Sequence, residues 1–123
     1  MAKLSNFLRS GEGGALSFHC PGCDEIHTVH VGQGSGPRWG YNGNPERPTF
    51  TPSILTRFTK ITEKGEQQYR DYIDGKIPAQ TLDHIDMVCH SFVTDGRIQF
   101  LGDCTHVLAG KTVDLPPHFK DDE

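Results

Sequence analysis

Two short stretches near the N-terminus alternate apolar and polar residues with the period of a β-strand. They are "ALSFHC" at residues 15–20 and "EIHTVHV" at residues 25–31, and the segment "CPGC" at residues 20–23 lies across their junction. Alternation with a period of two, together with β-branched residues, favours strands over helices. We therefore expect two antiparallel strands joined by a tight turn.

Residues 38–55, "RWGYNGNPERPTFTPSIL", alternate aromatic residues with turn-forming residues. Proline cannot donate to the hydrogen-bond ladder of a sheet, so it is tolerated at sheet edges, strand ends and bulges. Pro45, Pro48 and Pro52 therefore restrict this stretch to an edge strand, a loop or an extended segment.

The C-terminal third contains the strongest local signal, the dipeptide Asp95-Gly96 between two apolar-rich runs. Such a dipeptide favours a two-residue hairpin turn. We expect the strands of this hairpin at residues 87–94 and 97–106. Because side chains alternate between the two faces of a strand, this register fixes which residues share a face.

The predicted hairpin register places Cys89, Cys104 and His106 on one face of the sheet. The same register places His90 and Asp103 together on the opposite face. A single bulge near Gly102 would exchange these assignments, because a slip of one residue reverses every side chain.

Residues 60–83 are the most polar part of the chain. We expect an insertion there, with a short helical turn around residues 69–73. Residues 119–123 are expected to form a solvated tail. At 123 residues the chain has the length of one domain, 1–123. The expected fold class is mainly β: a small antiparallel domain with a C-terminal hairpin and little helix.

The composition narrows the classes of partner. The net charge is −4 and the basic residues are scattered, so binding to nucleic acid is not expected. The segment "MAKLSNFLRSGEGG" lacks the apolar run of a signal peptide, and no segment approaches the ~20 apolar residues that cross a bilayer. We therefore expect a cytoplasmic protein without membrane contact. Cysteines in a reducing cytoplasm are more often metal ligands or catalytic groups than disulfide partners.

Cys20 and Cys23 have the spacing of a redox pair, of half a disulfide framework or of half a metal site. A thioredoxin-type pair needs a helix after its first cysteine, whereas a strand-like segment follows Cys23. A tight turn between strands instead directs two thiolates to one point, as in a tetrahedral zinc site. We call this turn, residues 20–23, the knuckle. We therefore predict bound Zn²⁺, with its other ligands from the "CH" and "CTH" segments near the C-terminus.

Zinc normally takes four protein ligands, and the sequence offers six candidates. They are Cys20, Cys23, Cys89, His90, Cys104 and His106. The set is large enough to close the coordination shell, which favours a structural metal over a catalytic one. If the protein is an enzyme, Asp103, His90 and Glu25 are the candidates for proton transfer near a metal-bound water. A supporting role for Asp103, as the hydrogen-bond partner of an imidazole, is the more common case.

Three aromatic residues, Trp39, Tyr41 and Phe50, could form an exposed platform for a peptide or a partner protein. In a domain of this size such residues more often belong to the core.

The segments "FHCPGCDEIH", "RPTFTPSIL" and "CHSFVTDGRIQFLGDCTHVLAGKTVDLP" resemble a family of small proteins of unknown function in tailed bacteriophages and bacterial prophages. Members are sometimes labelled "ammonia monooxygenase" in genome records, although the chain shows neither a copper-type histidine array nor membrane spans. The resemblance implies a phage or prophage context and a bacterial host cell. The family pattern contains His90, Asp103 and His106 as well as the knuckle, so the resemblance implies that these residues belong to the site. It also favours His90 over Cys104 as a metal ligand.

Related domains occur beside bacterial ubiquitin-like conjugation genes, so the resemblance also implies, by analogy, a peptidase-like or conjugation-accessory role. Two hypotheses follow. The first is a zinc-stabilised accessory protein that binds a host or virion protein. The second is a zinc-dependent hydrolase with His90 and Asp103 near the metal. A closed metal shell supports the first hypothesis, and an open coordination position facing a pocket supports the second.

Overall fold

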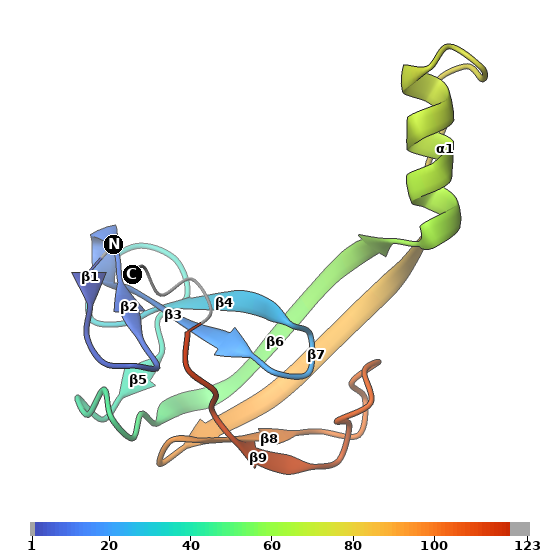
Figure 1. Ribbon diagram of the computed structural model, residues 1–123. Coiled ribbons are helices and arrows are strands. Elements are labelled where there is room, and N and C mark those ends of the chain that lie inside the picture. The colour runs from blue at the N-terminus through green and yellow to red at the C-terminus, as the bar shows by residue number, and fades with distance from the viewer. Residues whose placement is uncertain (1, 119–123) are drawn as a thin grey trace.

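The computed structural model describes residues 2–118 and is mainly β, as predicted (Figure 1). The N-terminal part forms a sheet of four antiparallel strands in the order β1-β2-β3-β4. The strands of this sheet are β1 (Ala2–Lys3), β2 (Arg9–Ser10), β3 (Ala15–Cys20) and β4 (Glu25–His30), with a 3-10 helix, η1 (Glu12–Gly14), before β3. The predicted pair of strands around the "CPGC" turn is confirmed as β3 and β4.

The second sheet has five antiparallel strands in the order β5-β6-β7-β8-β9. They are β5 (Gly40–Tyr41), β6 (Phe50–Ile61), β7 (His84–Thr94), β8 (Arg97–Phe100) and β9 (Thr112–Asp114). β6 and β7 form a long ribbon that extends away from the rest of the sheet (Figure 1). The predicted hairpin at Asp95-Gly96 joins β7 and β8, and Val93 pairs with Ile98 as the register requires.

Apolar side chains from both sheets form one core. Phe18 of β3 stacks on Phe50 of β6, with ring centroids 6.1 Å apart. Buried residues alternate with exposed ones along β7 and β8, so each strand turns one face to the core. Cys89 lies on this inner face and His90 follows it on the outer face. Because the two side chains point to opposite faces of β7, Cys89 and His90 belong to two different candidate sites.

One expectation about the strands is confirmed in part and another is wrong. Among the described residues, β5 pairs with β6 only at Phe50 and Thr51, so Pro52 lies where β6 has β7 as its single strand partner, as at a sheet edge. Pro52 is accommodated because the register of β6 against β7 shifts between Phe50 and Ile54, so no ladder hydrogen bond is needed from its nitrogen. The second hairpin strand ends at Phe100 instead of continuing to residue 106, and the chain then turns into an irregular loop.

The polar insertion contains more helix than predicted. α1 (Glu63–Ile73) begins after Thr62, whose hydroxyl accepts a hydrogen bond from Gly65 N–H, and it projects from the far end of the β6–β7 ribbon (Figure 1). Within residues 2–118, no helix is both long and apolar enough to cross a membrane. The expected solvated tail, residues 119–123, lies outside the described residues.

Gly65 generates a prediction about the helix. Alanine is favoured over glycine in a helix by about 1 kcal/mol. A Cβ atom at Gly65, however, would lie 2.2 Å from the carbonyl oxygen of Asp83. We therefore predict that Gly65→Ala lowers the free energy of unfolding of α1 by about 1 to 3 kcal/mol, measured by circular dichroism in urea. The exposed neighbour provides the control: Lys64→Ala should leave the transition unchanged within about 0.5 kcal/mol. Equal behaviour of the two variants would contradict the predicted clash.

Candidate active site and metal cluster

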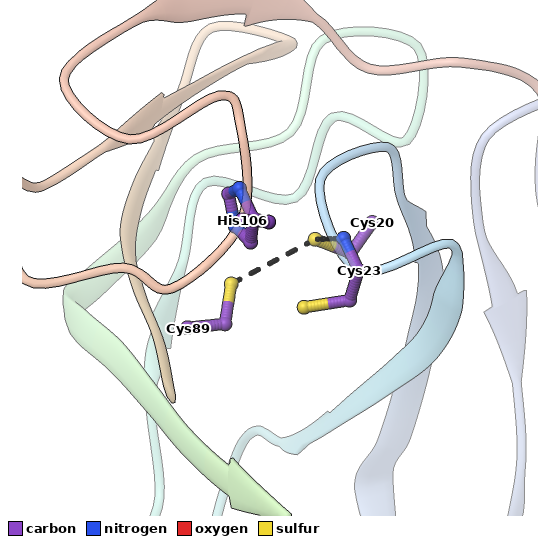
Figure 2. Close-up of side chains that lie close together, drawn as sticks. All are labelled: Cys20, Cys23, Cys89 and His106. Atoms are coloured by element: carbon purple, nitrogen blue, oxygen red, sulfur yellow. Dashed lines mark hydrogen bonds between the residues drawn. The ribbon is translucent and has the colours of Figure 1, made fainter. Parts of the chain in front are cut away.

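Four potential metal ligands converge between the two sheets. The donor atoms of Cys20, Cys23, Cys89 and His106 all lie within 4.8 Å of one another. Cys20 ends β3, Cys23 lies in the turn before β4, Cys89 is on the inner face of β7, and His106 is in the loop after β8. Figure 2 shows the three thiols and the imidazole grouped together from these separate segments. The group, called here the metal cluster, can hold one ion.

The backbone of the "CPGC" turn is shaped for this convergence. Asp24 adopts a left-handed conformation, with φ of 54°, and its N–H donates to the carbonyl of Cys20 at 2.9 Å. The N–H of Cys23 points at Cys20 Sγ, 3.5 Å away. Gly22 is required by the close approach of His106, because a Cβ atom there would lie 2.2 Å from the ring atom Cε1.

The imidazole of His106 has the properties of a ligand. Its Nε2 atom is buried and has no hydrogen-bond partner, which is uncommon for a buried polar atom unless an ion or a water satisfies it. Burial lowers the pKa of His106 and so favours the neutral ring, the form that binds metals. Nδ1 lies 3.2 Å from the N–H of Leu108. When a metal binds Nε2, the ring proton lies on Nδ1. Nδ1–H and the N–H of Leu108 are then two donors facing each other, so the distance between them must increase.

The three cysteines of the cluster are free thiols that interact closely. Cys20 Sγ and Cys89 Sγ are 3.8 Å apart. Hydrogen bonds from Cys23 and Cys89 lower the pKa of Cys20, while the hydrogen bond to Cys20 raises the pKa of Cys23 to about 12. The pKa of Cys89 is also raised, first by its hydrogen bond to Cys20. The three thiols therefore do not ionise independently, and a cation is the natural partner for thiolates at this point.

A second group lies on the outer face of the same sheet. Nε2 of His90 is 3.0 Å from the hydroxyl oxygen of Ser53, and Nδ1 of His90 is 3.1 Å from a carboxylate oxygen of Asp103. Ser53 comes from β6, His90 from β7 and Asp103 from the loop after β8. A hydroxyl, an imidazole and a carboxylate in this sequence of contacts form the constellation of a serine nucleophile with its base.

The hydrogen-bond partners fix the direction of each contact. An ionised carboxylate only accepts hydrogen bonds, so Asp103 requires the ring proton of His90 to lie on Nδ1. In the neutral ring Nε2 is then an acceptor, and the hydroxyl of Ser53 donates to it. This arrangement leaves the Ser53 oxygen ready to lose its proton to His90.

Ser53 is held where the register of β6 shifts. Its carbonyl oxygen accepts a hydrogen bond from the indole N–H of Trp39 at 3.2 Å. The imidazole of His90 and the carboxylate of Asp103 remain accessible, with 26% and 56% of their side-chain surfaces exposed. A substrate can therefore reach the group, called here the triad, from solvent.

The structure separates the six predicted metal ligands into two sets. Cys20, Cys23, Cys89 and His106 come together, whereas His90 and Cys104 lie outside the cluster. His90 is instead engaged by Ser53 and Asp103. The thiol of Cys104 contacts the backbone N–H and C=O of His90, both at 3.2 Å. The cause is the early end of β8, which changes the direction of the chain before Cys104.

The structure also locates the other predicted site residues. His90 and Asp103 lie side by side, as the hairpin register predicted. Glu25 is exposed at the start of β4, near the knuckle rather than in the triad. Phe50 is only 1% exposed and stacks on the half-buried Tyr41, so the three predicted aromatic residues do not form an exposed platform. Trp39 is also half-buried and supports Ser53.

Sequence reasoning missed Ser53. The residue lies in the segment "RPTFTPSIL" and no local pattern distinguishes it from the other serines. The sequence did offer one indication, the predicted proximity of His90 and Asp103. A histidine oriented by a carboxylate often has a nucleophile near its second ring nitrogen.

The cluster geometry predicts which cysteine substitutions cause the protein to lose its metal. We expect Cys20→Ser to reduce the metal bound to purified protein to well below one ion per chain. The melting temperature should fall by about 10 °C or more, because the binding free energy of a structural metal contributes to folding. Elemental analysis and a thermal melt measure the two effects. Cys104→Ala is the matched control and should retain the metal in full. Loss of metal from Cys104→Ala but not from Cys20→Ser would refute this assignment.

Comparison with known proteins places the chain in a family. The model of the family described as "Bacterial ubiquitination-like system serine protease (BubE)" matches residues 2–101, well over half of the chain. The match includes Ser53 and His90 and ends just before Asp103. No curated protein and no solved structure matches the chain. The chain therefore belongs to the BubE family of bacterial ubiquitination-like system serine proteases.

Proposed function

We propose that the protein is a serine peptidase with Ser53 as nucleophile, His90 as general base and Asp103 as the carboxylate that orients His90. The observation that carries the proposal is the continuous set of contacts from the Ser53 hydroxyl through both ring nitrogens of His90 to Asp103. The description of the family as serine proteases supports the same chemistry independently of this geometry.

The reaction follows from the atoms in contact. Ser53 Oγ attacks the carbonyl carbon of the scissile bond while its proton passes to Nε2 of His90. The imidazolium is stabilised by Asp103 at Nδ1 and donates the Nε2 proton to the leaving group as the bond to the carbonyl carbon breaks. The acyl group stays on Ser53 as an ester. A water molecule, deprotonated by His90, then hydrolyses the ester, and the proton returns to Ser53.

The substrate class is suggested by the family description. The description places the family in a bacterial ubiquitination-like system, and we propose that the substrate of this chain is an acyl bond at the end of a ubiquitin-like protein. The exposed position of His90 and Asp103 suits a protein substrate, since a folded partner can reach the triad without entering a deep cavity.

We assign zinc to the metal cluster, in a structural role. Three thiolates and one imidazole would supply four protein ligands, the number that fills the shell of a structural zinc ion. The zinc-dependent hydrolase that the sequence offered as an alternative is therefore disfavoured. The four ligands are all protein side chains, and His90 contacts Ser53 rather than the metal cluster. Bound zinc would withdraw charge from the thiolates and hold the two sheets together.

The competing hypothesis is a phage or prophage accessory protein that only binds a host or virion protein. Both hypotheses place the protein in the bacterial cytoplasm. The triad favours the enzyme, because binding alone does not require a hydroxyl, an imidazole and a carboxylate in continuous contact.

Active-site labelling tests the proposed nucleophile. We expect a fluorophosphonate probe to modify Ser53 in the zinc-loaded protein, as identified by mass spectrometry of the adduct peptide. Ser53→Ala should abolish labelling. His90→Gln should slow labelling by about 1,000-fold or more, because removal of the base from such a triad has effects of this size.

Ser91→Ala is the matched control. Ser91 is buried next to His90 in sequence and its hydroxyl has no hydrogen-bond partner, so the variant should label like the parent. Labelling at a serine other than Ser53, or unchanged labelling of Ser53→Ala, would overturn the proposal.

A further inference from the structure

The metal cluster and the triad are built on two shared segments of chain. We propose that the metal acts as a positioning device for the triad: by holding His106 and Cys89, it fixes Asp103 and His90 in contact with each other. This inference rests on the proposed serine peptidase function. It gives the cluster a role in activity without giving the metal any contact with the substrate.

The first shared segment is β7. Cys89 and His90 are adjacent, and successive side chains on a strand point to opposite faces of the sheet. Cys89 is buried among the metal ligands, whereas His90 faces outward to Ser53 and Asp103. A restraint on the Cys89 side chain therefore also limits the rotation of β7 that would move His90.

The second shared segment is the loop between β8 and β9. Asp103 and His106 are three residues apart in this loop, which has no regular secondary structure. Its backbone follows β7, with hydrogen bonds from Leu101 N–H to His90 C=O at 2.9 Å and from Thr105 N–H to Val88 C=O at 3.0 Å. His106 is the residue of this loop that reaches across to the knuckle, where its ring lies against Gly22.

The contact between His90 and Asp103 is too weak to order this loop by itself. The pair is open to solvent, with more than half of the Asp103 side chain exposed, and ion pairs in such positions contribute little to stability. His106, by contrast, has a buried nitrogen without a partner and lies among three buried thiols. Without a cation these groups favour a loop that opens to water. With a cation they hold the loop closed.

Ser53 provides the contrast within the triad. It lies on β6, and its carbonyl is held by Trp39, neither of which contributes a ligand to the cluster. We therefore expect release of His106 to disturb the contact between His90 and Asp103 while leaving Ser53 in place. A general loss of structure would disturb all three residues.

The experiment releases only the loop. In His106→Ala we expect the three thiolates to bind zinc with an external fourth ligand, so the link between the sheets remains. The loop keeps its hydrogen bonds to β7 at His90 and Val88 and loses only its link to the knuckle. We expect this variant to retain its metal and its overall amide spectrum. It should lose the downfield proton resonance of His90 Nδ1–H and should react with the fluorophosphonate probe about 100-fold more slowly, since misplacement of a catalytic group by about 1 Å has effects of this size.

His106→Cys separates ligation from packing. The imidazole of His106 packs edge-on against Phe100, with ring centroids 4.5 Å apart, and cysteine does not replace this contact. Cysteine does restore a fourth thiolate ligand. We expect His106→Cys to recover both the resonance and the labelling rate to within about 10-fold of the parent.

Replacement of zinc by cadmium in the parent should leave the labelling rate unchanged, because a positioning metal supplies no Lewis acidity to the substrate.

The outcomes distinguish the two proposals. If His106→Ala keeps both the resonance and the labelling rate, the coupling is wrong and the proposed triad stands. If His106→Cys binds metal but does not recover the resonance, ring packing rather than ligation positions the loop, and the coupling is also wrong. If zinc-loaded parent protein shows the resonance but no labelling at Ser53, and His106→Ala loses the resonance, the proposed function fails while the positioning of His90 and Asp103 by the metal is upheld.

Discussion

The alternation of side chains along β7 is the constraint on which both candidate sites depend. An extended strand turns each residue to the face opposite its neighbour, so Cys89 and His90 cannot serve the same site. Cys89 meets the knuckle between the sheets, and His90 meets Ser53 and Asp103 outside them. A shift of one residue in the register of β7 would destroy both groups at once. The partners on β6 and β8 fix that register on both sides of the strand.

The cluster is also a point at which distant parts of the chain meet. It joins the turn between β3 and β4, the centre of β7 and the loop after β8, as Figure 2 shows. The four-stranded and five-stranded sheets are also connected by apolar packing, such as the stack of Phe18 on Phe50, and by hydrogen bonds, such as that from Lys60 Nζ to the carbonyl of Cys23. A small domain has limited apolar surface to bury, so a metal bound at the cluster would add to the stability that the core supplies.

The elements with local signals were predictable. The knuckle strands follow from their alternation around "CPGC", and the hairpin follows from Asp95-Gly96, because both signals involve neighbouring residues. The extent of the second hairpin strand was not predictable. Its apolar pattern continues beyond Phe100, but the chain turns there into a loop that is held to β7 by backbone hydrogen bonds at His90 and Val88. Cys104 is buried in the core with Cys89, as parity predicts, but its thiol contacts the backbone of His90 and lies outside the metal cluster.

The sequence by itself determined the mainly β fold, the paired thiols of Cys20 and Cys23, and the opposition of Cys89 to His90, because each depends on alternation or on a turn of a few residues. Tertiary structure alone decided which of the six candidate ligands join the cluster and that Ser53 faces His90. These contacts join residues that are far apart in the chain. Their geometry depends on where β8 ends and where β6 shifts its register, and long-range packing sets both points.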